Sequence, residues 1–424
     1  MKTGKRHYAW RIFVALLVLT FAMGHSSSYG LFFVPVSEEF GVKTTAFALT
    51  YTLLTYFEAF CAPLCANWYK KVDARLSVGV SIAITGICFG LQGVCNAMWQ
   101  LYVLNCIMGV VAGLLVLQMN AELVSHWFAT NIAFLIGLSS CLRGIGGAVW
   151  NGIGGWCIDM VGWRWTFIIF GIAILALGLP AAMVLRKDPS EIGLRPYDIE
   201  NADPETFQED PMRKPGLMFK EMLKKSAFWV FTLTIGVATF CNVLYGYLAT
   251  FLQNEKGMTS TTAGICNAAL MIGGAIFYVL IGKVFDKSPK IATIICYAGS
   301  IIAYPVLVYT KNMSLFGFLL CFFMIGMTYQ PSGGCLYPNL VRDLGGDKDF
   351  TIHQGFQVFV LCFTGGLGST GWGWCIEKLG FEKSFTLCAV MYAVCVGIFI
   401  WSQVSAKKWR KLPEWQPGVG VKAE

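Results

Sequence analysis

The stretch from Trp127 to Phe167 reads WFATNIAFLIGLSSCLRGIGGAVWNGIGGWCIDMVGWRWTF. In it, a glycine-rich apolar run follows a short polar hinge, and Arg143 stands in the middle of that run. About 20 apolar residues in a helix cross a hydrocarbon core of roughly 30 Å, so the stretch predicts a membrane-spanning helix. An arginine near the bilayer centre is costly and usually faces a protein interior or a water-filled cavity. Arg143 is therefore the leading candidate for a functional site.

The end of this stretch recurs later in the chain. Residues 155–163 read GWCIDMVGW, and residues 373–381 read GWCIEKLGF, an offset of 218 positions. Internal repeats of this kind are found in membrane transporters that are built from two similar halves. We therefore expect two related halves around a central site to which Arg143 belongs.

The composition indicates a membrane protein. The chain is 56% hydrophobic and 13% charged, whereas soluble domains carry about 25% charged residues. Sixteen cysteines are scattered, mostly singly, through apolar segments without metal-binding spacing. We read them as small buried hydrophobic residues and expect neither disulfides nor a metal or other cofactor.

Hydrophobic runs predict an all-α membrane protein with twelve transmembrane helices in two pseudo-symmetric six-helix bundles. Besides the opening stretch, which is the fifth helix, the expected spans are 10–35, 46–68, 76–95, 99–124, 165–185, 227–252, 262–281, 291–309, 315–340, 355–376 and 384–404. The only long polar segment separates the two halves. We expect an N-terminal bundle at 1–185, a cytoplasmic linker at 186–226, a C-terminal bundle at 227–406 and a cytoplasmic tail at 407–424.

Lysine and arginine are distributed unevenly among the loops. If both termini are cytoplasmic, only six of the 32 lysines and arginines fall in the opposite loops, and Arg143 lies within a span. Cytoplasmic loops of membrane proteins carry such an excess of positive charge. The bias predicts a multi-pass protein of the cytoplasmic membrane with both termini inside. It also explains the formal net charge of +8 without a nucleic-acid partner.

A polar turn between the eighth and ninth spans reads GKVFDKSPK at residues 282–290. It resembles the G-x-x-x-D-[RK]-x-x-[RK] gating turn of the major facilitator superfamily, and the resemblance implies a gating role for Asp286 and Lys287. The corresponding turn of the first half has Ala66 in place of the glycine and Lys70 in place of the aspartate. Lys71 and Arg75 are its candidate gating residues.

Two further motifs resemble the oxalate–formate antiporter and monocarboxylate transporter branch of that superfamily. Residues 29–41 read YGLFFVPVSEEFG, and residues 188–196 read DPSEIGLRP. The oxalate–formate proteins hold two carboxylates with an arginine and a lysine in the second half. The matching positions here are Tyr278 and Leu361, which disfavours oxalate itself.

The candidate substrate-binding residues fall into two chemical groups. The first half supplies residues at membrane depth with titratable or hydroxyl groups: Arg143, His25, Tyr29 and Glu58. The second half supplies neutral polar residues: Asn242, Tyr245, Tyr278, Tyr329, Gln330 and Gln357. Two structural alternatives stay open: Arg143 and Glu58 as a buried structural pair, and His25 as a hydrogen-bonded core histidine.

The sequence therefore predicts a secondary active transporter for a small organic anion, a monocarboxylate, which works by alternating access. Proton symport and anion exchange both remain open, with protons and the lipid bilayer as further partners of a monomer. The alternative is a major facilitator exporter of amphipathic or cationic compounds, in which Glu58 binds the cargo. A non-transporting receptor of this fold is a third reading. Because the sequence shows no nucleophile–base pair, phosphate loop or metal cluster, an enzyme is not expected.

Overall fold

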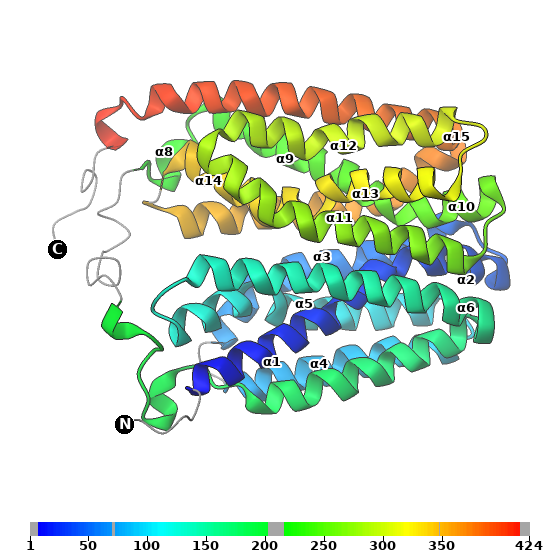
Figure 1. Ribbon diagram of the computed structural model, residues 1–424, viewed down its shortest axis with the longest axis horizontal. Coiled ribbons are helices and arrows are strands. Elements are labelled where there is room, and N and C mark those ends of the chain that lie inside the picture. The colour runs from blue at the N-terminus through cyan, green and yellow to red at the C-terminus, as the bar shows by residue number, and fades with distance from the viewer. Residues whose placement is uncertain (1–6, 70–72, 202–215, 347, 416–424) are drawn as a thin grey trace. The chain divides into compact units, whose positions relative to one another are not determined.

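The computed structural model describes residues 7–69, 73–201, 216–346 and 348–415 (Figure 1). The side chains of residues 62–69, 113–122, 132–133, 201, 286, 351, 406 and 414 lie outside this description. Across the described residues the chain is built of helices, and its only β pairing is two isolated bridges, Phe128–Tyr197 and Gly216–Gly346. The prediction of an all-helical fold is confirmed.

The first half of the chain runs through α1 (Tyr8–Met23), η1 (Gly24–Phe32), α2 (Phe33–Phe40), α3 (Thr44–Tyr69), α4 (Ala74–Leu91), η2 (Gln92–Val94), α5 (Met98–Trp127) and α6 (Ile132–Val184). The linker holds the short elements η3 (Pro189–Ile192), η4 (Ile199–Asn201) and α8 (Phe219–Met222). The second half runs through α9 (Ser226–Asn242), η6 (Val243–Tyr247), α10 (Leu248–Lys256), α11 (Ser260–Lys287), α12 (Pro289–Tyr309), α13 (Leu315–Pro331), η7 (Ser332–Leu336), α14 (Tyr337–Gly345), α15 (Phe350–Trp409) and η8 (Pro413–Trp415).

The two longest helices are hairpins of two rods each. α6 breaks at Gly162, where φ is 82° and ψ is 164°, and α15 breaks at Gly380, where φ is 77° and ψ is 169°. This backbone region is essentially restricted to glycine. Both glycines occupy the same place in the repeated nine-residue motif. The described part of each half therefore supplies six long rods, which agrees with the twelve expected spans.

The first rod of each half changes its helical winding partway along. α1 passes into the 3₁₀ segment η1 at Gly24, and α9 passes into η6 at Val243. In η1 the hydroxyls of Ser26, Ser27 and Ser28 donate to carbonyls three residues back, at 2.7–3.1 Å. These hydroxyls give the backbone carbonyls hydrogen-bond partners outside the regular α-helical pattern. They are therefore compatible with the tighter 3₁₀ winding of η1.

Eight helical segments of the described residues are long and apolar enough to cross a membrane. Two of these segments, Phe134–Val184 and Ile352–Trp409, are the hairpins. Helices satisfy their own backbone hydrogen bonds, as a segment surrounded by lipid requires. Rows of exposed aliphatic side chains along these helices are the surfaces expected to face lipid.

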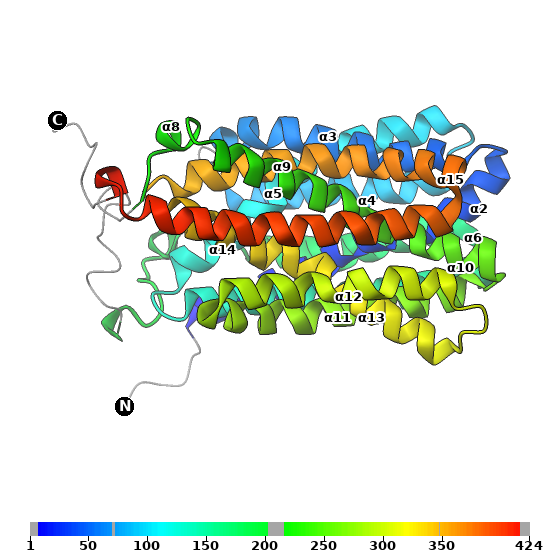
Figure 2. The ribbon, with the colours of Figure 1, turned by 90° about the horizontal axis from the view of Figure 1, so that it is seen from above.

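The helices form two compact units. The first consists of Met1–Asp203 with Gly246–Ala268, and the second of Pro204–Tyr245 with Ala269–Glu424. The first unit is centred on α6, which packs against α1 and α4. In the second unit α15 packs along α9 and α12, and the red rod of α15 follows α12 in both Figure 1 and Figure 2. The predicted boundaries at 186 and 227 stay a prediction.

Aromatic side chains fill both cores. In the first unit Phe32 stacks on Phe167 with ring centroids 4.1 Å apart, and Phe89 lies 5.0 Å from Phe167. In the second unit Tyr297 lies 5.3 Å from Tyr392. Buried aromatic rings contribute large apolar areas, so these clusters fix how the rods pack.

Candidate functional site

Arg143 lies in α6, at the centre of the glycine-rich run. Leu138, Ile145 and Val149 form an exposed apolar stripe on this helix. A helix turns by about 100° per residue, so Arg143 projects more than about 100° away from each of these three residues. Its side chain is nevertheless exposed. An exposed guanidinium outside the apolar stripe indicates contact with water rather than with lipid.

The glycines around Arg143 let α1 approach α6 closely. A Cβ on Gly24 would lie 2.5 Å from the backbone nitrogen of Gly147, and one on Gly146 would lie 2.4 Å from the Phe21 carbonyl oxygen. Trp150 Nε1 donates to that same Phe21 carbonyl at 3.1 Å. The run GIGGAVW after Arg143 thus fixes the arginine's backbone beside the start of η1, which carries His25.

His25 is buried at the turn from α1 into η1. Its Nδ1 lies 2.9 Å from the Ala22 carbonyl oxygen, and its ring makes an edge contact with Phe89 at 4.9 Å. Arg143 acts on His25 through its positive charge. The bond to Ala22 favours a proton on Nδ1 and orients the ring.

Glu58 is half-buried on α3. It lies on the helix face of Tyr51 and Thr55, and the Tyr51 ring is 6.1 Å from Tyr29 of η1. The charge of Arg143 also acts on Glu58. Within the described part of the chain, however, no hydrogen bond or ion pair within 4.0 Å joins these two side chains. The structure therefore brings Arg143, Glu58 and His25 into one electrostatic cluster without a closed salt bridge.

Tyr29 belongs to a buried neutral network in the first unit. Its hydroxyl donates to Asn105 Oδ1 at 2.8 Å and accepts from Gln92 Nε2 at 3.1 Å. Asn105 Nδ2 in turn donates to Gln92 Oε1 at 3.3 Å and to the Leu101 carbonyl at 2.9 Å. Sequence reasoning missed Gln92 and Asn105, because nothing in their spacing links η2 to α5. The predicted contact of Tyr29 with substrate stays a prediction.

Two neutral candidates of the second half, Asn242 and Gln357, form hydrogen bonds with other side chains of their unit. Asn242 Nδ2 donates to Ser332 Oγ at 2.8 Å, and Asn242 Oδ1 accepts from the Tyr392 hydroxyl at 2.7 Å. Gln357 Nε2 donates to Thr232 Oγ1 at 2.8 Å. These amides connect α9 to the C-terminal helices.

The remaining candidates of the second half gather around a distortion of the tenth expected span. α13 ends at Pro331, and the π-helical turn η7 follows, a feature found often at functional sites. The Tyr278 hydroxyl donates to the Gly334 carbonyl of this turn at 2.8 Å, and Gln330 Nε2 lies 3.4 Å from Met271 Sδ. The rings of Tyr245 and Tyr329 approach to 3.9 Å.

The candidate gating residues are only partly described. Lys71 and the Asp286 side chain lie outside the described residues. Lys287 is exposed at the end of α11. Arg75 lies 3.7 Å from the carboxylate of Asp73, whose side chain caps α4 through the Arg75 amide at 2.9 Å. The first-half turn therefore carries a capping carboxylate three residues after Lys70, which the motif comparison overlooked.

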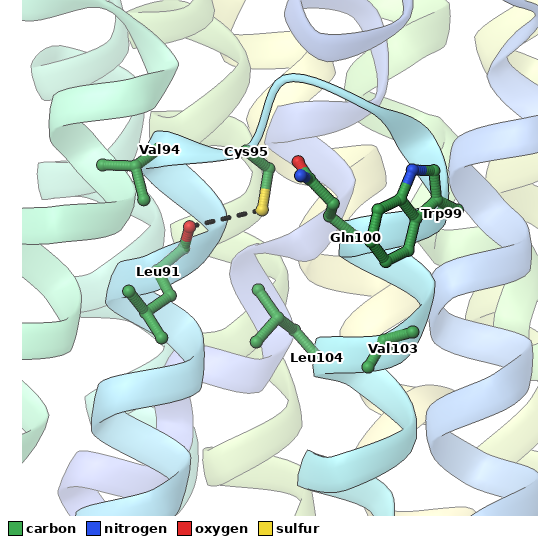
Figure 3. A pocket seen from close by; sticks show the side chains of 7 residues that line it. All are labelled: Leu91, Val94, Cys95, Trp99, Gln100, Val103 and Leu104. Carbon is green, nitrogen blue, oxygen red and sulfur yellow. Dashed lines mark hydrogen bonds between the residues drawn. The ribbon is translucent and has the colours of Figure 1, made fainter.

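A groove lies between the end of α4 and the start of α5, as Figure 3 shows. It is an open groove of about 270 Å³ and contains none of the candidate residues: its lining is Leu91, Val94, Cys95, Trp99, Gln100, Val103 and Leu104. Leu91, Val94 and Trp99 are all exposed. An apolar lining with a tryptophan at a helix end is typical of a surface that faces lipid near the membrane interface.

Comparison with known proteins agrees with the helical plan. The model of the Major Facilitator Superfamily matches residues 14–349. The chain belongs to the major facilitator superfamily. It is therefore a multi-pass membrane protein and a transporter rather than an enzyme.

Individual relatives are distant. The human MFS-type transporter SLC18B1 is 20% identical over 94% of this chain and 88% of its own length. The D-galactonate transporter of Escherichia coli is 19% identical over 67% of this chain and 68% of its own length. A probable hexose phosphate transport protein of Chlamydia pneumoniae is 26% identical, but the match covers only 40% of this chain and 41% of that relative.

Solved structures show the same fold at low identity. A bacterial homologue of the human lysosomal transporter Spinster, in an inward-facing and unoccupied conformation, superposes with a TM-score of 0.75 at 17% identity, covering 97% of this chain and all of that one. The nucleoside transporter NupG superposes with a TM-score of 0.67 at 12% identity, covering 94% of this chain and 99% of that one. These structures extend the superfamily assignment to the fold of the helices.

Proposed function

We propose that this major facilitator protein is a secondary active transporter of a small organic anion, and that Arg143 binds the carboxylate of that anion. The cargo is a monocarboxylate, and transport proceeds by alternating access. The motifs at residues 29–41 and 188–196, which resemble the oxalate–formate and monocarboxylate branch, support this proposal.

The observation that carries the proposal is the environment of Arg143. The guanidinium is exposed, it points away from the apolar stripe of α6, and no ion pair within 4.0 Å joins it to a carboxylate among the described side chains. A charge at membrane depth must meet water, a counter-ion or a ligand. The planar fork of arginine binds a carboxylate through two parallel hydrogen bonds, which lysine cannot form.

The neutral chemistry of the second half supports a single carboxylate on the cargo. Its candidate groups are hydroxyls, amides and aromatic rings, and Tyr278 and Leu361 stand where the oxalate–formate branch has its two cations. Two of the relatives are named for anionic sugars, D-galactonate and hexose phosphate. An anionic cargo for this chain agrees with those names.

Glu58 is the candidate for proton coupling. It shares the electrostatic cluster with Arg143 but forms no closed pair with it. A carboxyl group at membrane depth can be neutral or charged according to its surroundings. In symport, a proton on Glu58 would remove the negative charge that competes with the cargo for Arg143, whereas in exchange the incoming anion would itself balance the charge of Arg143.

The proposed orientation places both termini and the linker in the cytoplasm of a monomer in the cytoplasmic membrane. It rests on the lysine and arginine distribution, since cytoplasmic loops carry the positive excess. The proposed domains are bundles at 1–185 and 227–406.

The test is binding of a panel of carboxylates and organic cations to purified protein, followed by uptake in proteoliposomes. Arg143→Lys should weaken binding of the preferred carboxylate by about 1.5–3 kcal/mol, the range for hydrogen bonds to charged groups. Arg186→Lys, just past the far end of α6, is the matched control and should bind normally. If the double variant Arg143→Gln, Glu58→Gln transports the carboxylate with normal affinity, Arg143 is a structural counter-ion. The proposal that it binds the anion is then wrong. Selective stabilisation by cations would instead favour the exporter of cationic compounds.

A further inference from the structure

A segment of the second half is part of the first compact unit. Residues Gly246–Ala268 comprise the end of η6, all of α10 and the first turns of α11, and they cluster with the helices of the first half. The chain on either side of this segment, Pro204–Tyr245 and Ala269 onward, belongs to the second unit. We call Gly246–Ala268 the strap, because it comes from the second half of the sequence and packs on helices of the first.

Asp159 of α6 caps the helix that begins in the strap. Its carboxylate accepts hydrogen bonds from the Ser260 amide at 3.1 Å, the Thr261 amide at 2.6 Å and the Thr261 hydroxyl at 2.5 Å. Ser260 and Thr261 are the first two residues of α11, whose amides have no partner within the helix. A negative charge at a helix N-terminus is also favoured by the helix dipole.

Glycines bring the strap into backbone contact with α6 beside this cap. A Cβ on Gly155 would lie 2.2 Å from the Ser260 carbonyl oxygen, and a Cβ on Gly264 would lie 2.4 Å from the Asn151 carbonyl oxygen. At the other end of the strap, a Cβ on Gly30 would lie 2.5 Å from the Gly246 carbonyl oxygen. Contacts this close, built from small residues, are how helices associate in membranes.

A buried polar chain completes the contact but leaves one acceptor unsatisfied. Asn267 Nδ2 donates to Asn151 Oδ1 at 3.2 Å, and Asn151 Nδ2 donates to Ser27 Oγ at 2.9 Å. Asn267 is 2% exposed, and its Oδ1 has no hydrogen-bond partner among the described residues. An unpaired buried acceptor costs free energy. The polar bonds therefore stabilise the docked strap, whereas the buried Asn267 Oδ1 destabilises it. A contact of this kind favours reversible release.

We propose that the Asp159 carboxylate is a latch, a group whose hydrogen bonds hold the strap on α6. Release of the strap from Asp159 is then the step that opens this end of the transporter. The carboxylate satisfies the helix N-terminus only while the strap is docked, so the three hydrogen bonds break together when the strap leaves. This inference uses the transporter fold and does not depend on the anion proposed for Arg143.

The test measures the distance between α6 and the strap without any substrate. Spin labels are attached to cysteines introduced at the exposed positions Met160 and Glu255, in a chain whose label-reactive native cysteines are replaced. Wild-type protein should show a dominant short distance. In Asp159→Asn the ratio of long to short distances should rise by on the order of tenfold, the effect of losing one charge-assisted hydrogen bond.

Glu39→Gln is the matched control. Glu39 accepts from Trp163 Nε1 at 2.5 Å and from Arg164 Nε at 2.9 Å, so it holds the bend of α6, and no hydrogen bond among the described residues joins its side chain to the strap. The control should leave the distances unchanged. The proposal that Asp159 holds the strap is overturned if the distance distribution of Asp159→Asn equals that of wild type. It is also overturned if Glu39→Gln shifts the distances as much as Asp159→Asn does.

Thr261→Val covers the case in which Asp159→Asn does not fold. It removes only the hydroxyl donor and should raise the long-distance fraction by a smaller factor. No change in a folded Thr261→Val protein then overturns the proposal. A failed carboxylate-binding assay would overturn the anion site and leave this result standing.

Discussion

The bends of α6 and α15 are nearly superimposable in their local geometry, although 218 residues separate them. Gly162 has φ 82° and ψ 164°, and Gly380 has φ 77° and ψ 169°. Four residues later a hydroxyl returns to the glycine carbonyl in each case, from Thr166 at 2.8 Å and from Ser384 at 2.7 Å. The repeat has kept the backbone turn and the hydrogen bond that closes it.

The centres of the two halves differ in chemistry. The first half carries Arg143, Glu58 and His25 in one electrostatic cluster, whereas the candidates of the second half are neutral groups such as Asn242, which binds Ser332 and Tyr392. The combination of positive φ with extended ψ found at Gly162 and Gly380 requires glycine, but a spanning helix requires only that its lipid-facing side be apolar. The backbone of the repeat is therefore constrained at its corners, while the inward-facing side chains have been free to diverge.

The largest effect should come from removing the acidic member of the first-half cluster. If transport is coupled to protons, Glu58→Gln should abolish pH-gradient-driven accumulation in proteoliposomes and leave substrate exchange intact, because a glutamine cannot carry the proton. His25→Gln should do less, since His25 is already held by the Ala22 carbonyl. Full gradient-driven accumulation by Glu58→Gln would assign coupling to another group.

The two bends should respond alike to substitution. Gly162→Ala and Gly380→Ala should each cost about 1–3 kcal/mol of stability, the range for a residue forced into a sparsely populated backbone region. Apart from its own chain neighbours, a Cβ at either position meets no atom of the described residues within 4 Å, so the cost is conformational and not steric. Gly137→Ala, in the first rod of α6 and also in open space, is the control. Thermal unfolding in detergent checks all three, and clearly unequal costs at the two bends would contradict their equivalence.

Each unit has a buried network of neutral side chains. Replacing the central asparagine of the network should cost a similar amount of stability in both units, although the two centres differ in chemistry. Asn105→Leu removes the acceptor of the Tyr29 hydroxyl and a donor to Gln92, and Asn242→Leu removes the acceptor of the Tyr392 hydroxyl and a donor to Ser332. Hydrogen bonds between membrane helices are worth about 0.6 kcal/mol on average, so each variant should lose about 1–2 kcal/mol. The measurement is again thermal unfolding. A neutral effect of either variant would show that its network adds nothing to the fold.

The smallest effect concerns the start of the linker, where Asp188 caps η3. Hydrogen bonds from Ser190, with the nearby His126, hold the pKa of Asp188 below its ordinary value of 3.8. A lowered pKa in the folded state adds stability above pH 3.8, and this stability is lost as the pH falls through the lowered value. Asp188→Ala should therefore melt slightly lower near neutral pH, by less than about 1 kcal/mol, and match wild type in strong acid.

Asp188→Asn is the control for charge in this last experiment. It keeps an acceptor for the Ser190 amide at every pH and should fall between the other two proteins. A difference between Asp188→Ala and wild type that persists unchanged in strong acid would show that the carboxylate charge plays no part.

Much of this protein follows from its sequence alone. Hydrophobic runs predict the positions of the helices, because a segment in lipid must satisfy its backbone internally and be about 20 residues long. The repeated motif predicts two related halves, and the structure then places a bend at its glycine in each half, Gly162 and Gly380. The cost of charge in a membrane singles out Arg143 and Glu58 by their positions within apolar runs.

Other features depend on contacts between residues far apart in the chain. Hydrophobic runs do not predict the change of helical winding at the 3₁₀ segments η1 and η6 or at the π-helical turn η7. The network of Tyr29 with Gln92 and Asn105, and the cap of Asp159 on α11, join helices whose order along the chain says nothing about their contact. Hydrophobic periodicity reports how much of a helix is apolar and on which side. The partner of a buried polar group is set by distance and angle in the folded molecule, and only the tertiary structure decides it.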